Sequence, residues 1–135
     1  MTYTDRDDYL WTMSGRGRLL ALMDGEQVCG YCTYVMVHDE AEAESLFRRD
    51  YKFSPPEETG GSMVFIDQLM TSKWDRSLLR QVQELITQRH PSWTQGIWYR
   101  HTPRGWRVYT LGRGGAFYGH QVVGPCRQPV RVGAA

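Results

Sequence analysis

A chain of 135 residues, 41% hydrophobic and 13% aromatic, is long and apolar enough for one domain with a core, which excludes a disordered chain. No apolar stretch approaches the roughly 18–20 residues of a membrane-spanning helix. The acidic N-terminus also lacks a signal-peptide profile. We therefore expect a cytoplasmic protein that has no membrane partner.

The net charge of +1 hides an uneven distribution along the chain. Residues 1–60 hold 12 Asp/Glu and 6 Lys/Arg, a balance of −6, whereas residues 61–135 hold 3 and 10, a balance of +7. Fourteen of the 16 basic residues are Arg, whose planar fork suits phosphate and carboxylate groups. This asymmetry has two interpretations: an anionic ligand on the second half, or packing of the acidic half against the basic half.

The first half of the chain predicts a hairpin and a helix. Residues 1–15 form a lead-in helix or arm, with Tyr9, Leu10 and Trp11 as anchors. The run RLLALMDGEQVCGYCTYVMV then predicts two strands around the turn Asp24-Gly25. The segment HDEAEAESLFRRD follows with its acids early and its Arg residues late, an order that suits a helix dipole.

The cysteines indicate buried side chains in a reducing compartment. Three Cys is an odd number, which does not fit a disulfide framework. Cys29 and Cys32 form a C-x-x-C pattern, but strand alternation would place their thiols on opposite faces. Cys126 lies far away in the tail, so we expect no metal; a zinc or redox site remains the alternative interpretation.

The second half predicts a buried strand, a long helix and another hairpin. SMVFIDQLM is the strand, and SKWDRSLLRQVQELITQRHP is a helix with Ser72 and Asp75 as a capping box. QGIWYR and GWRVYTLGR form the hairpin around Thr102–Gly105. Residues 1–111 would form a single domain, and the Gly/Pro-rich residues 112–135 form a tail or add an edge strand at 117–123. The order β-β-α-β-α-β-β predicts an α+β fold, with helices packed on a mostly antiparallel mixed sheet.

This order, with a long helix directly after a central apolar strand, resembles the GNAT-type acyltransferase superfamily. The resemblance implies that the strand 65–70 splays from its neighbour and pairs with the pantetheine arm of acyl-CoA. It also implies a pyrophosphate on the amides of 72–75, at the helix N-terminus. The implied cofactor-binding residues are Phe65, Gln68, Leu69, Met70, Ser72, Lys73, Trp74 and Arg76. The superfamily's glycine-rich loop is replaced here by Ser-Lys-Trp-Asp-Arg-Ser.

A narrower resemblance rests on CGYCTYVMVHDEAEAESLF and MVFIDQLM, and it spans residues 18–111. These segments are similar to the toxin-activating lysine-acyltransferase group and related small phage proteins. In that group an acyl carrier protein supplies the acyl group, and a His with an Asp carries the chemistry. Asp67 matches the Asp of the group's Ile-Asp pair. The group's His precedes the first strand, yet residues 1–37 contain no His, which also fits a catalytically silent protein.

Three residues are candidates for catalysis. Asp67 interrupts an apolar strand, and a buried carboxylate needs a partner or a function; the alternative is a solvent-facing or Arg-paired side chain. His38, at a strand end, is the first candidate for a general base. The GNAT resemblance implies a late-strand Tyr that protonates the leaving thiolate, and Tyr109 fits this role. A structural or solvated role is the alternative for both His38 and Tyr109.

The last hairpin interleaves aromatic and cationic residues at Trp98, Arg100, Trp106 and Arg107. Such a pattern is typical of single-stranded nucleic-acid binding and of protein interfaces, and equally of a plain amphipathic sheet. The sequence therefore predicts two functions. One is acyl transfer from acyl-CoA or an acyl carrier protein to an amine of a protein target. The other is a silent binder of a host protein or nucleic acid that uses this hairpin; a homodimer is compatible with both.

Overall fold

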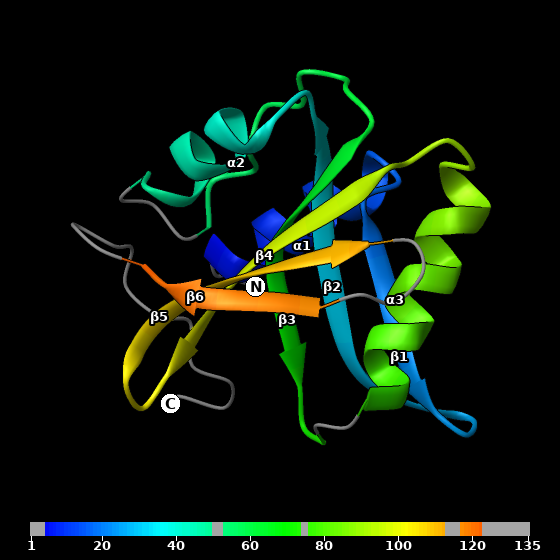
Figure 1. The fold of residues 1–135 in the computed structure, drawn as a ribbon. Coiled ribbons are helices and arrows are strands. Elements are labelled where there is room, and N and C mark those ends of the chain that lie inside the picture. Colours follow the sequence, from blue (N-terminus) through cyan, green and yellow to red (C-terminus); the bar gives the residue numbers. More distant parts are fainter. Residues whose placement is uncertain (1–4, 50–52, 74–75, 113–116, 123–135) are drawn as a thin grey trace.

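The computed structural model describes residues 5–49, 53–73, 76–112 and 117–122 (Figure 1). These residues form three helices and one six-stranded mixed sheet, so the predicted α+β class is confirmed. The helices are α1 (Asp5–Gly15), α2 (Glu40–Phe47) and α3 (Arg76–Arg89). The strands are β1 (Leu19–Asp24), β2 (Gln27–Val37), β3 (Met63–Thr71), β4 (Gln95–Thr102), β5 (Gly105–Gly112) and β6 (Phe117–Gln121).

The chain therefore contains two elements that the predicted order leaves out. Residues 5–15 form a helix, one of the two alternatives expected for the lead-in. Residues 117–121 form the expected edge strand, which pairs with β5 in antiparallel orientation, so the sheet extends beyond residue 111. The strands lie in the order β1-β2-β3-β4-β5-β6, and only β3 and β4 are parallel among the pairs that the described strands form. No described helix is long and apolar enough to cross a membrane.

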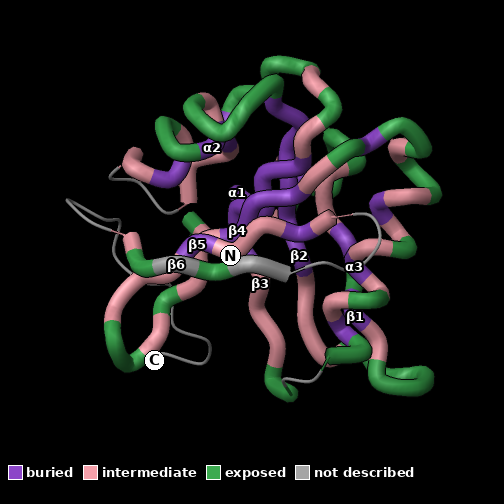
Figure 2. Tube along the Cα trace, viewed as in Figure 1, coloured by how far each residue is buried: buried purple, intermediate pink, exposed green. Residues whose placement is uncertain are grey.

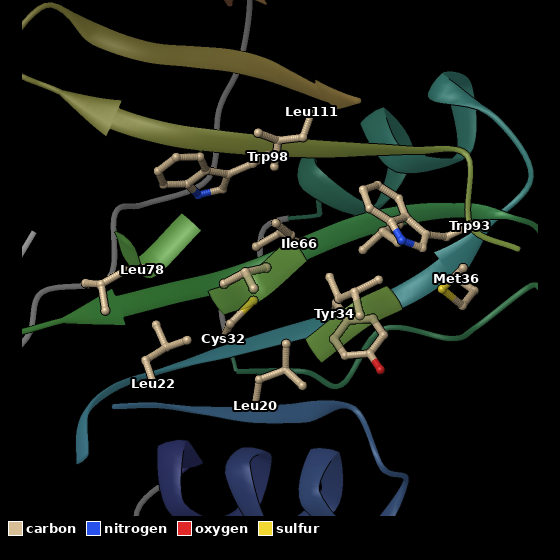
Figure 3. Close-up of a cluster of buried hydrophobic side chains, with 13 residues drawn as sticks. Leu20, Leu22, Cys32, Tyr34, Met36, Ile66, Leu78, Trp93, Trp98 and Leu111 are labelled. Carbon is tan, nitrogen blue, oxygen red and sulfur yellow. The ribbon is translucent and has the colours of Figure 1, made fainter. Parts of the chain in front are cut away.

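Helices cover both faces of the sheet, and each face has its own core. On the α3 face, Leu78, Val82 and Ile86 pack over the strands. Their spacing of four residues places them on one side of the predicted helix. Figure 3 shows this cluster, with side chains from β1 and β2 beside Ile66, Trp93 and Trp98. The central strands are accordingly the most buried part of the fold (Figure 2).

On the opposite face, called the α1 face below, α1 and α2 pack over the strands. Tyr9 and Met13 of α1 and Phe47 of α2 are buried there. Trp11 is 83% exposed, so the prediction of Trp11 as an anchor is wrong. The reason is geometric: residues 9 and 13 share one side of the helix, and residue 11 lies roughly opposite.

A β-bulge in β2 changes the position of the two cysteines. Leu22 pairs with Gly30 and Met23 with Val28, so Cys29 is an extra residue in the ladder. Simple alternation therefore fails here, and Cys29 packs against the same α3-face cluster that contains Cys32. The prediction of opposite faces is corrected by this bulge.

A second bulge lies in β3 and determines where the polar residues point. Thr33 pairs with Gln68 and Tyr34 with Ile66, so Asp67 is the extra residue. Ile66 and Leu69 both contact the α3-face cluster. The two residues between them consequently face α1 together.

β3 and β4 separate immediately after this bulge (Figure 1). Their ladder contains four pairs, from Met63↔Gln95 to Ile66↔Trp98. β3 continues to Thr71 and β4 to Thr102, and beyond Ile66 β3 pairs with β2 alone. One edge of β3 from residue 67 to residue 71 therefore lies outside any strand ladder of the described chain.

Candidate functional site

The centre of the candidate site is the carboxylate of Asp67, which the bulge directs beneath α1. Its side chain is 0% exposed. The Tyr9 hydroxyl donates to Asp67 Oδ2 at 2.5 Å, and Arg49 Nη2 lies 4.0 Å from Oδ1. A buried carboxylate needs charge-assisted hydrogen bonds to offset its lost hydration, and Tyr9 supplies one of them.

Thr33 completes a hydrogen-bonded chain with these residues. Thr33 Oγ1 lies 2.6 Å from the Tyr9 oxygen and accepts the Gln68 amide at 3.1 Å. Because the single Tyr9 proton goes to the carboxylate, the Thr33 hydroxyl must donate to Tyr9. Among the described residues, no buried side-chain polar atom lacks a hydrogen-bond partner. We call Tyr9, Thr33, Asp67 and Gln68 the bulge cluster.

The environment of the cluster keeps its neighbours neutral. Burial, reinforced by the negative charge of Asp67, raises the pKa of Tyr9 far above its usual range. The same two causes, in the same order, raise the pKa of the Cys32 thiol. Tyr9 is therefore a hydrogen-bond donor at physiological pH and not a base, and Cys32 is not a thiolate nucleophile.

The cluster approaches the surface through Tyr31. The Tyr31 hydroxyl donates to Gln68 Oε1 at 2.9 Å, and the Arg6 guanidinium lies 5.7 Å from the centre of the Tyr31 ring. Burial raises the pKa of Tyr31, while the Arg6 charge opposes that rise. Gln68 thus links the buried carboxylate to a half-buried aromatic residue beside the edge of β3.

The structure does not bring the three predicted catalytic residues together. Asp67 lies on the α1 face. Tyr109 lies on the α3 face, where it packs near Trp98 with ring centroids 5.6 Å apart. The His38 side chain is 57% exposed and its Nδ1 lies 3.3 Å from Glu42 Oε1 at the start of α2. The residue that contacts Asp67 from before the first strand is Tyr9, which sequence reasoning identified only as a hydrophobic anchor.

The predicted phosphate seat after β3 is already partly occupied by the fold itself. The Ser72 amide donates to the Cys29 carbonyl at 2.9 Å, and the Lys73 amide donates to Thr71 Oγ1 at 3.2 Å. Lys73 Nζ lies 3.4 Å from Asp24 Oδ2. The expectation that these two amides receive a pyrophosphate is therefore corrected, because Ser72 continues the ladder with β2 and the Lys73 amide is bonded to the Thr71 side chain.

The other predicted cofactor-binding residues have mixed positions. Trp74 and Asp75 lie outside the described residues, so the capping box and half of the predicted seat have no structural account. Arg76 is exposed at the first residue of α3. Phe65 is buried in the α1-face core, whereas Leu69 and Met70 are half-buried.

The aromatic and cationic residues of the last hairpin are divided between the two faces. Trp98 is only 4% exposed and belongs to the α3-face core, so the prediction of Trp98 as a partner-binding surface residue is wrong. Trp106 packs edge-on against Phe47 on the α1 face, with ring centroids 4.9 Å apart. Arg100 follows Trp98 by two residues, and Arg107 directly follows Trp106. Strand alternation therefore places both arginines on the α3 face, where they are cross-strand partners.

Two further polar features lie outside the bulge cluster. At the far end of α3, His90 Nε2 lies 2.9 Å from the Tyr34 hydroxyl; burial, followed by the nearby Arg18 charge, lowers the pKa of His90. A groove of about 240 Å³ lies between α2 and β4–β6, with Glu40, Glu44 and Tyr99 among its walls. No group of three His, Cys, Asp or Glu side chains able to hold a metal occurs in the described part of the chain.

Together these observations define an α+β protein whose mixed sheet splits between two parallel central strands, with a buried Tyr-Asp pair at the point of separation. Comparison of the chain with protein-family models, with curated proteins and with solved structures found no match.

Proposed function

We propose that the chain is an acyltransferase-type protein of GNAT-like architecture that binds an acyl thioester along the edge of β3. The observation that carries this proposal is the end of the β3–β4 ladder at Ile66↔Trp98, while β3 runs on to Thr71. Long helix α3 follows this strand directly, in the arrangement that the sequence resemblance implies.

The edge of β3 offers the hydrogen-bonding groups that a pantetheine arm needs. Met70 pairs with Tyr31, and the Ser72 amide binds the Cys29 carbonyl. Backbone groups alternate in direction along a strand, so the N–H and C=O groups of Leu69 and Thr71 point away from β2. These two residues are about 7 Å apart along the strand, a spacing that suits the two amides of pantetheine.

The reaction would be attack of an amine on the thioester. The amine lone pair forms a bond to the carbonyl carbon, the C–S bond breaks, and the proton lost by the amine ends on the thiolate. Holding the thioester against a Lys amine of a protein target would supply most of the rate enhancement through proximity. The donor would be acyl-CoA or an acyl carrier protein, as expected from the sequence.

The test is calorimetric titration with acetyl-CoA, longer acyl-CoAs and an acylated carrier protein. We expect binding to the wild type and its loss in Leu69→Pro, because proline removes an outward N–H and fills the space beside the edge. Leu69→Ala removes the side chain but keeps that N–H, and we expect it to bind. Circular dichroism checks whether both variants are folded, and a wild type that binds none of the thioesters refutes the proposal.

A second candidate function is that of a catalytically silent binder on the same fold. The separation of Asp67, His38 and Tyr109 favours it, and so does the complete burial of the carboxylate. In this case the partner, a host protein or a nucleic acid, would contact the α3 face of the hairpin through Arg100 and Arg107, since Trp106 lies on the opposite face against Phe47. Recovery of the partner from lysate should fall when these two arginines are changed to Ala, and unchanged recovery argues against this surface.

A further inference from the structure

The β4–β5 hairpin presents two arginines side by side on the α3 face. Arg100 and Arg107 are direct cross-strand partners in an antiparallel ladder without register shifts. Their Cβ atoms are therefore about 5 Å apart on one face. Like charges placed directly opposite each other repel, so this pair lowers the stability of the ligand-free fold, and a bound anion would remove that repulsion.

The buried Trp98 ring positions the guanidinium of Arg100. Arg100 lies over the Trp98 ring, 5.9 Å from its centre, and Trp98 is itself fixed in the core. Arg107 Nη2 donates to the Gly119 carbonyl of β6 at 3.3 Å. An arginine fork has five N–H donors, so a contact to one carbonyl leaves others available to a ligand.

The hairpin that carries the pair contains no acidic residue. From Leu85 to the end of the chain there is no Asp or Glu, whereas Arg residues recur throughout the segment. Within the hairpin itself, residues 95–112, the charged side chains are those of Arg100, Arg104 and Arg107. An anion near the pair therefore meets no acidic neighbour along this hairpin.

The pair also lies on the arm of the sheet that leaves β3. The last β3–β4 pair is Ile66↔Trp98, and Arg100 follows Trp98 by two residues along the same side of β4. A ligand arm that lies along β3 at Leu69 and Thr71 thus has Arg100 across the opening. The amides of Ser72 and Lys73 are occupied by backbone and Thr71 contacts, so they do not compete for the ligand's charge.

We infer that Arg100 and Arg107 form a clamp for the phosphate group of the acyl thioester. The inference rests on the proposed function for the identity of the ligand, but the clamp itself is defined by the arginine pair. The shared chemistry is a phosphate joined to pantetheine. Its source is either the pyrophosphate of acyl-CoA or the phosphodiester of a carrier-bound arm.

The test measures three probes by calorimetry: inorganic pyrophosphate, acetyl-CoA and acetyl-pantetheine, which lacks phosphate. In R100A/R107A we expect affinity for the two phosphate-bearing probes to fall roughly tenfold per arginine, as expected for a hydrogen bond to a charged group. Acetyl-pantetheine should bind as in the wild type. The control R80A/R104A removes the same charge from exposed positions on α3 and in the hairpin turn, and it should bind all three probes normally.

The outcomes separate the clamp from the proposed function. If thioesters bind but R100A/R107A holds acetyl-CoA as tightly as R80A/R104A does, the clamp is wrong and the proposed function stands. If no thioester binds while pyrophosphate binding still requires the pair, the clamp stands and the proposed function fails. A parallel titration with acylated carrier protein assigns the source: a loss confined to that protein indicates the carrier's phosphodiester, and a loss for both indicates the shared phosphate.

Discussion

Replacing Tyr9 by Phe removes one hydroxyl from the bulge cluster and leaves the rest of the ring in place. Two hydrogen bonds are lost: the 2.5 Å donation to Asp67, whose side chain is 0% exposed, and the 2.6 Å bond that the Tyr9 oxygen accepts from Thr33. A hydrogen bond to a charged group contributes about 1.5–3 kcal/mol, and the burial of a carboxylate that has lost one of its donors adds to the cost. Arg49 Nη2, at 4.0 Å from the other carboxylate oxygen, is too far to replace it as a hydrogen-bond donor. We expect Tyr9→Phe to lower the free energy of unfolding by about 2–3 kcal/mol.

This loss corresponds to a clear shift in the melting temperature. An unfolding entropy of about 2.1 cal/mol/K per residue gives roughly 0.28 kcal/mol/K for the whole chain, so the expected decrease in Tm is about 7–11 °C. Urea denaturation followed by tryptophan fluorescence, together with a thermal scan by circular dichroism, measures both quantities. The m-value should stay constant, because the loss of one hydroxyl hardly changes the surface area that unfolding exposes.

Tyr31→Phe is the matched control for this variant. It also removes a tyrosine hydroxyl that donates on the α1 face, but the acceptor is the neutral Gln68 amide oxygen and Tyr31 is only half-buried. We expect a cost of about 0.5–1.5 kcal/mol. If Tyr9→Phe and Tyr31→Phe agree within about 0.5 kcal/mol, the buried carboxylate does not depend on its donor and the reasoning is wrong.

Two other predictions concern pH and backbone packing. Burial is the main cause that raises the pKa values of Cys32, Tyr9, Tyr31 and Tyr34 in the folded state. Because the unfolded chain loses these protons at lower pH than the folded chain does, the free energy of unfolding should fall as the pH rises above about 9–10. Each group contributes a slope of up to about 1.4 kcal/mol per pH unit; urea midpoints between pH 8 and 11 should show a shallower decline in Tyr9→Phe, and equal slopes would contradict the assignment. Gly30→Ala should destabilise the fold by about 2 kcal/mol or more, because its Cβ would collide with the Met70 carbonyl and lie 2.8 Å from Thr71 Cα, both in the backbone of β3. In Gly15→Ala the new Cβ has no atom within 4 Å, so this control should be neutral or slightly stabilising in the same urea titration, and a similar cost for both variants would exclude the clash as the cause.

Periodicity and turn residues were sufficient to predict most elements of the sheet and its helices. The Asp24-Gly25 turn, the acidic start of α2 and the apolar side of α3 are local signals, and each one acts over a few residues. The two bulges were not predicted, since a bulge is set by what the neighbouring strand and the covering helix require. In β2 and β3 a single extra residue reversed the faces of Cys29 and of Gln68, and alternation alone cannot reveal this.

Of the two central residues of the candidate site, the sequence predicted Asp67 but not the role of Tyr9. Asp67 stood out because a carboxylate interrupts an apolar strand, and the structure finds it buried. Its donor, Tyr9, lies 58 residues earlier in a helix whose sequence shows weak amphipathicity. A useful signal was available: a buried acid requires a donor, and Tyr9 shares a side of its helix with the apolar Met13 and carries a hydroxyl that can donate.

The structure also bears on the uneven charge of the two halves of the chain. Packing of the acidic half against the basic half would require ion pairs between them, and Lys73–Asp24 is an exposed pair of this kind. Arg18–Glu58 and Arg48–Glu44, in contrast, neutralise charges within the first half. Arg89 of the second half reaches across to the carbonyl oxygens of Gly17 and Leu19, which carry no net charge. Three of the arginines of the second half, Arg100, Arg104 and Arg107, lie on β4, on β5 and in the turn between them, and this local concentration of positive charge favours an anionic ligand at the hairpin.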